Sequence, residues 1–211
     1  MSVFDQLASA LDHADAIVDG RHPVPGKGMR KAAVLILLSD DDDPRGPRII
    51  LTERAAHLRK HAGQVSFPGG SRDGDETPEQ TALREAAEEC AIDSAGVRVL
   101  GRLPASSLPV TSFAVTPVVG VWESAAPLEM VPDPSEVTAI HAVPVRALSD
   151  PVNRGTWHYF DGHEGPAFVY GDLVIWGFTA MLLDGLLELA DWAQPWDRER
   201  VIMVPRRFGG R

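Results

Sequence analysis

The chain has 211 residues, of which 44% are hydrophobic and 24% are charged, and its net charge at pH 7 is -10. These values are typical of one globular domain, and they argue against a largely disordered chain and against a protein that coats nucleic acid or an anionic membrane. The single cysteine, Cys90, excludes an intrachain disulfide, and the apolar runs of the sequence are too short to span a bilayer. We therefore expect a cytoplasmic protein. Because the chain is acidic overall, a polyanionic substrate would require a local basic patch.

Apolar residues at helical spacing predict a first helix within residues 3–18. Residues 32–38 and 48–52 are predicted to form a hairpin, whose turn carries four consecutive aspartates, Asp40 to Asp43. Consecutive carboxylates in a turn bounded by Pro and Gly are typical of a solvated surface, so we do not interpret them as a metal site. Further strands are predicted at 97–103, 115–122, 137–145, 167–170 and 173–176, followed by a closing helix at 178–192. This pattern predicts an α+β fold, an α/β/α sandwich with a mixed sheet flanked by helices.

The start of a second helix is marked by three consecutive signals. Thr77 is a suitable N-cap, Pro78 suits the first helical position, and Gln80 completes a capping box. A helix is therefore predicted over residues 78–90.

The two faces of this helix follow from a rotation of about 100° per residue. Three glutamates, Glu85, Glu88 and Glu89, are expected on one arc. Small and apolar side chains are expected on the opposite arc: Ala82, Leu83, Ala86, Ala87 and Cys90. The small residues predict close packing of the helix on its neighbours.

The clustered carboxylates repel each other by a few tenths of a kcal/mol per pair, so a positive group should compensate them. Arg84, four residues before Glu88, could do so in a purely structural ion-pair network. The approach to the helix favours a metal ion instead, because a turn at residues 67–70 and then Glu76 place further oxygens nearby. Mg²⁺ prefers oxygen ligands, commonly a few carboxylates with water and substrate phosphates. The sequence therefore predicts a cation site and a phosphate substrate.

The stretch from Gly70 to Ile92 resembles the Nudix box, G-x5-E-x7-R-E-U-x-E-E-x-G-U, in which U is aliphatic. Seven fixed positions match at the family's spacing: Gly70, Glu76, Arg84, Glu85, Glu88, Glu89 and Ile92. Ala86 stands where a larger aliphatic residue is usual, and Ala91 stands where glycine is usual. If the helix end requires a positive φ at that position, alanine is strained there and the local turn could differ from the family's.

The resemblance implies a Nudix fold and a hydrolase that depends on Mg²⁺ or Mn²⁺. It implies that Glu85 and Glu89 are the principal metal ligands and that the Gly70 carbonyl is a backbone ligand. Glu88 would be a further ligand or would lie just outside the ligands.

The resemblance also implies roles around the metal. Arg84 would orient the glutamates, and Glu76 would brace the preceding loop. Family members place the general base differently, so Glu88, Glu89 and Glu136 all remain candidates for taking the proton of the attacking water.

Residues 50–70 resemble a second signature, which marks the coenzyme A diphosphatase branch, and only Ile50 departs from it. The segment is basic within an acidic chain: Arg54, His57, Arg59, Lys60 and His61. Arg side chains pair well with phosphate oxygens, and coenzyme A carries a diphosphate and a 3′-phosphate. The resemblance therefore implies that the substrate is bound by Arg54, Arg59, Lys60 and Phe67. A solvated basic loop is the alternative interpretation. Residues 133–137 and 175–180 are shorter segments that also resemble this branch.

The reaction implied is hydrolysis of coenzyme A, or a derivative, to 3′,5′-ADP and 4′-phosphopantetheine. Two alternatives stay open: a Nudix hydrolase of ADP-ribose or a dinucleotide, and a non-catalytic Nudix module that senses a nucleotide. We expect a small-molecule substrate and no nucleic-acid or membrane partner, and we leave a homodimer open. The expected organisation is an N-terminal helix and linker (1–30), a Nudix hydrolase domain (31–195) and a C-terminal tail (196–211).

Overall fold

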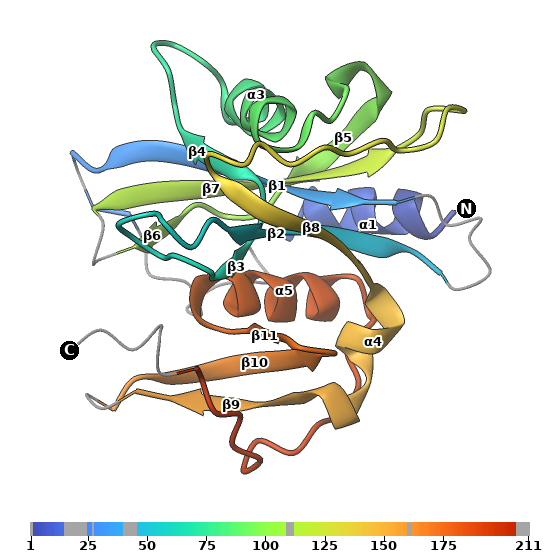
Figure 1. Ribbon diagram of the computed structural model, residues 1–211. Coiled ribbons are helices and arrows are strands. Elements are labelled where there is room, and N and C mark those ends of the chain that lie inside the picture. Colours follow the sequence, from blue (N-terminus) through green and yellow to red (C-terminus); the bar gives the residue numbers. More distant parts are fainter. Residues whose placement is uncertain are drawn as a thin grey trace.

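A mixed sheet forms the centre of the protein, as Figure 1 shows for the computed structural model. The structure describes residues 2–14, 25–26, 28–39, 46–108, 112–159 and 162–205. β1 (Arg30–Leu38) and β7 (Phe113–Trp122) run parallel at its middle, and the other strand pairs are antiparallel. Helices cover both of its faces, so the predicted α+β fold is confirmed.

The strands lie in the order β3-β2-β1-β7-β5, with β4 beside β1, β6 beside β7 and β8 beside β2. Their bounds are β2 (Arg48–Arg54), β3 (Val65–Ser66), β4 (Gly69–Ser71), β5 (Val97–Arg102), β6 (Ser106–Leu108) and β8 (Val137–Pro144). β1 pairs with β2 at Leu38↔Ile49 and with β4 at Val34↔Gly69. The short strand β4 therefore enters the sheet next to its central strand, and it lies against α3.

The side chains of β1 alternate between two apolar clusters. The covering helices are α1 (Val3–Leu11), α3 (Pro78–Cys90) and α5 (Gly177–Leu189). Ile36 and Leu38 pack with residues of α1 and α5, whereas Leu35 and Leu37 pack with residues of α3. On α3 the contact includes Ala82, whose small side chain is fully buried and lets the helix lie close to the sheet.

A second, three-stranded antiparallel sheet lies on the far side of α5 (Figure 1). Its strands are β9 (Arg154–His158), β10 (Glu164–Tyr170) and β11 (Leu173–Ile175), and the short helix α4 (Val145–Ser149) precedes them. Four leucines of α5 are 0% exposed: Leu182, Leu183, Leu186 and Leu187. Because its apolar side chains are not confined to one face, this helix requires cover on both sides. The sequence did not indicate that β9, β10 and β11 form a separate sheet.

Most predicted elements are confirmed at their expected positions. The helix at 78–90 carries the predicted capping box, in which the Thr77 hydroxyl accepts from the Gln80 N–H (3.3 Å) and the Gln80 side chain accepts from the Thr77 N–H (2.8 Å). The hairpin of β1 and β2 is confirmed, while its four aspartates and the end of the predicted first helix lie outside the described residues. Short elements such as β3, β4, β6 and α4 were missed. No helix among the described residues is long and apolar enough to cross a membrane.

The two ends of the described chain pack on the rest of the protein. Phe4, Leu7 and Leu11 of α1 are buried in the core. Near the other end, the Thr156 N–H donates to the Arg200 carbonyl (2.8 Å), and the Ile202 N–H donates to the Thr156 carbonyl (2.9 Å). The expected division at residues 30 and 195 stays a prediction.

Ala91 ends α3 in the left-handed region, with φ 55° and ψ 28°. Its N–H donates to the Ala87 carbonyl (2.9 Å), which closes the last turn of the helix. The helix therefore ends with a positive φ although alanine stands in place of the family's glycine. In this conformation the alanine Cβ crowds the backbone, which strains the residue.

Ala91→Gly should relieve this strain and raise the free energy of unfolding by about 0.5 to 1 kcal/mol, after the larger backbone entropy of glycine is subtracted. Ala87→Gly is the matched control, because Ala87 is an exposed residue within the same helix and should lose about 1 kcal/mol. Urea unfolding of the three proteins measures both changes. A loss of stability in Ala91→Gly would contradict the assigned strain.

Candidate active site

The three glutamates of α3 differ in burial. The side chain of Glu89 is 4% exposed, that of Glu85 15% and that of Glu88 61%. The prediction that they share one arc opposite the apolar residues is wrong, because Ala87 is exposed while Glu89 is buried beside Ala86. The face that packs on the sheet is rotated toward Glu89, so the carboxylates run from the helix–sheet boundary out to solvent.

The carboxylate of Glu89 lies between Gly69 and the guanidinium of Arg54. Gly69 and Gly70, where the chain turns into β4, are called the glycine turn below. Glu89 Oε2 accepts from the Gly69 N–H (3.1 Å), and Glu89 Oε1 lies 3.7 Å from Arg54 Nη1. Burial raises the pKa of Glu89 to about 7, against the opposing effects of the Gly69 hydrogen bond and the Arg54 charge. This carboxylate would therefore gain strongly from a closer positive charge.

Glu85 lies directly against the turn. A Cβ added at Gly70 would come within 2.6 Å of both carboxylate oxygens of Glu85, so a side chain at position 70 would fill the space beside them. Burial raises the pKa of Glu85 as well, and the Arg84 hydrogen bond opposes this rise. Glycine at position 70 thus keeps a small space lined by oxygens.

Arg84 joins the helix to the loop before it. Its guanidinium donates to Glu76 Oε1 (2.8 Å), Glu85 Oε1 (3.0 Å), Glu88 Oε2 (2.9 Å) and the Ser71 carbonyl (2.9 Å). The expected ion-pair network therefore exists, and it holds the carboxylates of Glu76, Glu85 and Glu88 at once.

Glu76 completes this network from the loop side. It accepts from Arg84, from the Thr81 hydroxyl (2.9 Å) and from the Asp73 N–H (3.1 Å). The Arg84 hydrogen bond, followed by that of Asp73, holds the pKa of Glu76 at about 2. Glu76 is thus a permanent anion that ties the loop to α3. Thr81, a fully buried hydroxyl, had no signal in the sequence.

Within the described parts of the chain, no three His, Cys, Asp or Glu side chains meet closely enough to hold a metal ion by themselves. Glu88 is turned toward Arg84 and solvent, so it does not join Glu85 and Glu89. A Mg²⁺ ion nevertheless commonly takes only one or two carboxylates and completes its shell with water and substrate phosphates. The two carboxylates beside the Gly69–Gly70 turn fit that mode, since they supply hard oxygen donors in a space that only glycine leaves open.

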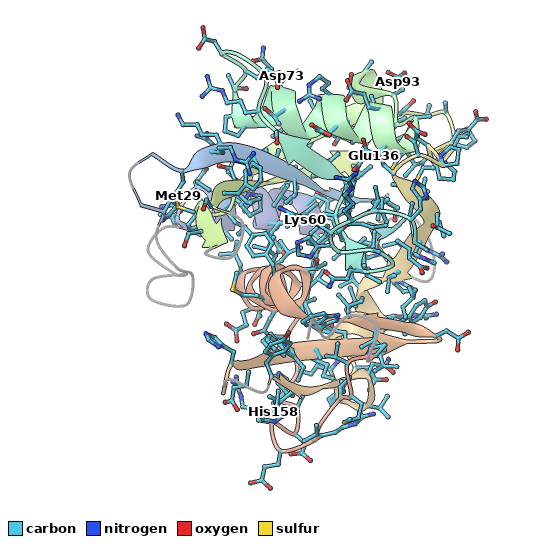
Figure 2. All side chains as sticks on the ribbon, turned by 60° about the vertical axis from the view of Figure 1, so that its left-hand side comes forward. Met29, Lys60, Asp73, Asp93, Glu136 and His158 are labelled. Atoms are coloured by element: carbon cyan, nitrogen blue, oxygen red, sulfur yellow. The ribbon has the colours of Figure 1, made fainter. Side chains whose placement is uncertain are left out.

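Glu136 lies near the same carboxylates, and its charge raises the pKa of both Glu85 and Glu89. Its turn is tied to α3, because the Asp133 N–H donates to the Glu89 carbonyl (2.9 Å). The Glu136 side chain is exposed, and Figure 2 shows it below α3. The structure thus brings this distant residue to the acidic cluster.

The predicted basic segment forms a loop, residues 54–64, which we call the basic loop. Arg59 and Lys60 are exposed on it, and Figure 2 shows Lys60 further from α3 than Glu136. The loop is joined to the Glu136 turn, since the Ala55 N–H donates to the Glu136 carbonyl (2.8 Å) and His57 Nε2 lies 3.1 Å from the Ser135 carbonyl oxygen. The basic loop therefore borders the acidic cluster, and its Arg54 reaches Glu89.

Phe67 lies elsewhere. Its side chain is 4% exposed and packs in the cluster on the α1 and α5 face of the sheet, away from the face covered by α3. The structure therefore does not present this aromatic ring to a ligand, and we leave it out of the substrate contacts proposed below.

Comparison with known proteins agrees with this geometry. A family model described as the NUDIX domain matches residues 29–161. A protein from Salmonella paratyphi B, named "Uncharacterized Nudix hydrolase NudL", is 41% identical over 161 residues, which are 73% of this chain and 79% of that protein. The relative of the same name from Salmonella newport has the same identity and coverage.

Two crystal structures share the fold. The Nudix hydrolase RenU from M. smegmatis has a TM-score of 0.53 and 22% identity, covering 85% of this chain and 99% of its own. A NUDIX hydrolase from Alicyclobacillus acidocaldarius has a TM-score of 0.50 and 19% identity, covering 76% and 91%. With the domain match over more than half of its length and a relative above 40% identity, this chain belongs to the Nudix hydrolase family.

Proposed function

We propose that this Nudix hydrolase cleaves the diphosphate linkage of coenzyme A or a derivative, with Mg²⁺ or Mn²⁺ as cofactor. The observation that carries the proposal is the pairing of Arg54 with Glu89, because it joins the basic loop to the acidic cluster. One ligand can then meet both charges, with a diphosphate at the carboxylates and a further phosphate on the loop.

The preference for coenzyme A follows from the charges of that loop. The chain carries a net charge of -10, so a basic loop beside an acidic cluster is a local reversal of sign. The exposed Arg59 and Lys60 suit the 3′-phosphate, which ADP-ribose and dephospho-coenzyme A lack. The likeness of residues 50–70 to the coenzyme A diphosphatase signature supports the same substrate.

The chain's residues divide the reaction between them. Glu85, Glu89 and the Gly70 carbonyl would hold the cation, which when bound neutralises the diphosphate oxygens and acidifies water. Arg84 fixes Glu85 and Glu88, and Glu76 fixes Arg84. Arg54 would hold a phosphate oxygen.

In the chemical step, water attacks one phosphorus of the diphosphate and the bond from that phosphorus to the bridging oxygen breaks. The products are 3′,5′-ADP and 4′-phosphopantetheine, and the water proton passes to a carboxylate. Glu136, Glu88 and Glu89 are the candidate bases. Glu136 is exposed next to the buried pair, so it can take the proton without giving up a place at the cation.

A substrate comparison tests the proposal. We expect kcat/KM for coenzyme A to exceed that for dephospho-coenzyme A and ADP-ribose by about 10- to 100-fold, the value of one or two charge-assisted hydrogen bonds. Arg59→Gln should reduce the rate with coenzyme A and leave dephospho-coenzyme A almost unchanged. Mass spectrometry of products formed in water enriched in heavy oxygen identifies the bond cut and the phosphorus attacked.

The outcome also separates the alternatives. Faster hydrolysis of ADP-ribose or a dinucleotide would contradict the proposed substrate and retain a Nudix hydrolase. Tight binding of coenzyme A without product in Mg²⁺ or Mn²⁺ would instead indicate a nucleotide-sensing module.

Glu89→Gln should lower kcat by on the order of 100-fold or more at saturating Mg²⁺, because the cation loses a charged ligand. Glu79→Gln is the matched control: it removes a carboxylate from the same helix, where Glu79 pairs with Arg102 (3.2 Å). Steady-state kinetics of both variants measure the difference. Near wild-type turnover in Glu89→Gln would show that Glu89 does not hold the metal.

The raised pKa of Glu89 also predicts a pH-dependent stability of the metal-free protein. Its pKa of about 7 in the folded protein exceeds the value of 4.5 for a solvated glutamate, so its favourable contribution is complete below pH 4.5 and is lost as the pH rises through 7. Relative to wild type, Glu89→Gln should therefore be more stable at pH 8.5 than at pH 5, by on the order of 2 kcal/mol. Thermal unfolding with a chelator measures this, and an equal difference at both pH values would contradict it.

A further inference from the structure

Arg54 is the first residue of the basic loop and lies where the pairing of β2 with β8 is irregular. The pairing of β2 with β8 shifts register between Glu53 and Arg54, and such an irregularity re-aims the side chains beside it. The backbone of Arg54 is held by the opposite end of the loop, since its N–H donates to the Gln64 carbonyl (3.0 Å) and its carbonyl accepts from the Gly63 N–H (2.9 Å). The backbone is thus fixed at the point where the side chain leaves the loop.

Among the described residues, the side chain of Arg54 makes a single, long ion pair. Its Nη1 is 3.7 Å from Glu89 Oε1, a distance outside hydrogen-bond range, and the side chain is 26% exposed. Glu89 by contrast is 4% exposed and needs a positive neighbour. The ion pair therefore partly offsets the buried charge of Glu89, but it holds the side chain of Arg54 only weakly.

We propose that Arg54 is an exchangeable counter-ion, which pairs with Glu89 before the divalent cation binds and turns to a phosphate oxygen of the substrate afterwards. This inference rests on the proposed function and assigns Arg54 a second state. The cation and the guanidinium compete for the same carboxylate, and they repel each other at that distance. An Arg fork displaced from Glu89 is suited to a phosphate.

The exchange couples the two binding steps. Arg54 weakens binding of the cation alone, because the ion pair with Glu89 has to be broken first. A phosphate ligand that engages Arg54 removes this competition, and by linkage the cation strengthens binding of the phosphate to the same extent. Removing the guanidinium should therefore change the two affinities in opposite directions, which a purely structural role of Arg54 would not do.

Direct binding of Mn²⁺, followed by electron paramagnetic resonance at pH 8.5 without any nucleotide, tests the first half. Arg54→Gln should bind Mn²⁺ about 3- to 10-fold more tightly than wild type, since a repelling charge is lost. Arg59→Gln is the matched control, because it removes the same charge from the same loop at an exposed position, and its Mn²⁺ affinity should stay within about twofold of wild type. Arg54→Lys keeps the charge and should also stay close to wild type.

Calorimetric titration of 3′,5′-ADP at saturating Mn²⁺ tests the second half. Arg54→Gln should bind this ligand about 10-fold or more weakly, and Arg54→Lys should show an intermediate loss because the fork is absent. Unchanged or weaker Mn²⁺ binding in Arg54→Gln overturns the exchange. Absence of Mn²⁺ binding to the wild-type protein would instead overturn the proposed function itself, so the two failures are distinguishable.

Discussion

The burial of the Glu89 carboxylate is the constraint on which the site depends. A carboxylate that is 4% exposed costs free energy unless hydrogen bonds and charges offset the lost water. The protein supplies one backbone N–H from Gly69 and one distant guanidinium from Arg54, and the raised pKa shows that these compensate only in part. The fold thus holds in place an anion that a divalent cation would stabilise.

Three segments that are distant in sequence meet around this carboxylate. β4 brings the glycine turn beside the central strand, the end of β2 brings Arg54, and the turn before β8 brings Glu136. On the other side of the cluster, Glu76 and Arg84 fix the more exposed glutamates. Each part of the cluster contacts its own arginine. Arg84 donates to four acceptor groups and fixes the exposed glutamates. Arg54 makes one long ion pair, and we propose that it changes partner.

The sequence predicted the local features of the site and missed those set by packing. The α3 bounds follow from Thr77, Pro78 and Gln80 because capping depends on neighbours in the chain. The rotation of that helix on the sheet depends on tertiary contacts, so the sequence analysis placed Ala87 with the packed residues and Glu89 on the opposite arc. The pairing of Arg54 with Glu89 was not predicted, because it joins the end of β2 to α3, two segments that only the tertiary fold brings together. Similarly, the burial of Phe67 depends on α5, which lies far along the chain.

We propose that the carboxylates beside the glycine turn form a cation site. Anomalous diffraction from crystals soaked in Mn²⁺ tests it most directly, because the anomalous signal locates the ion independently of the ligands assigned to it. We expect a peak next to the carboxylates of Glu85 and Glu89 and the carbonyl of Gly70, with Arg54 displaced from Glu89. A peak elsewhere, or an occupied site that leaves Glu89 paired with Arg54 and away from the ion, would contradict it.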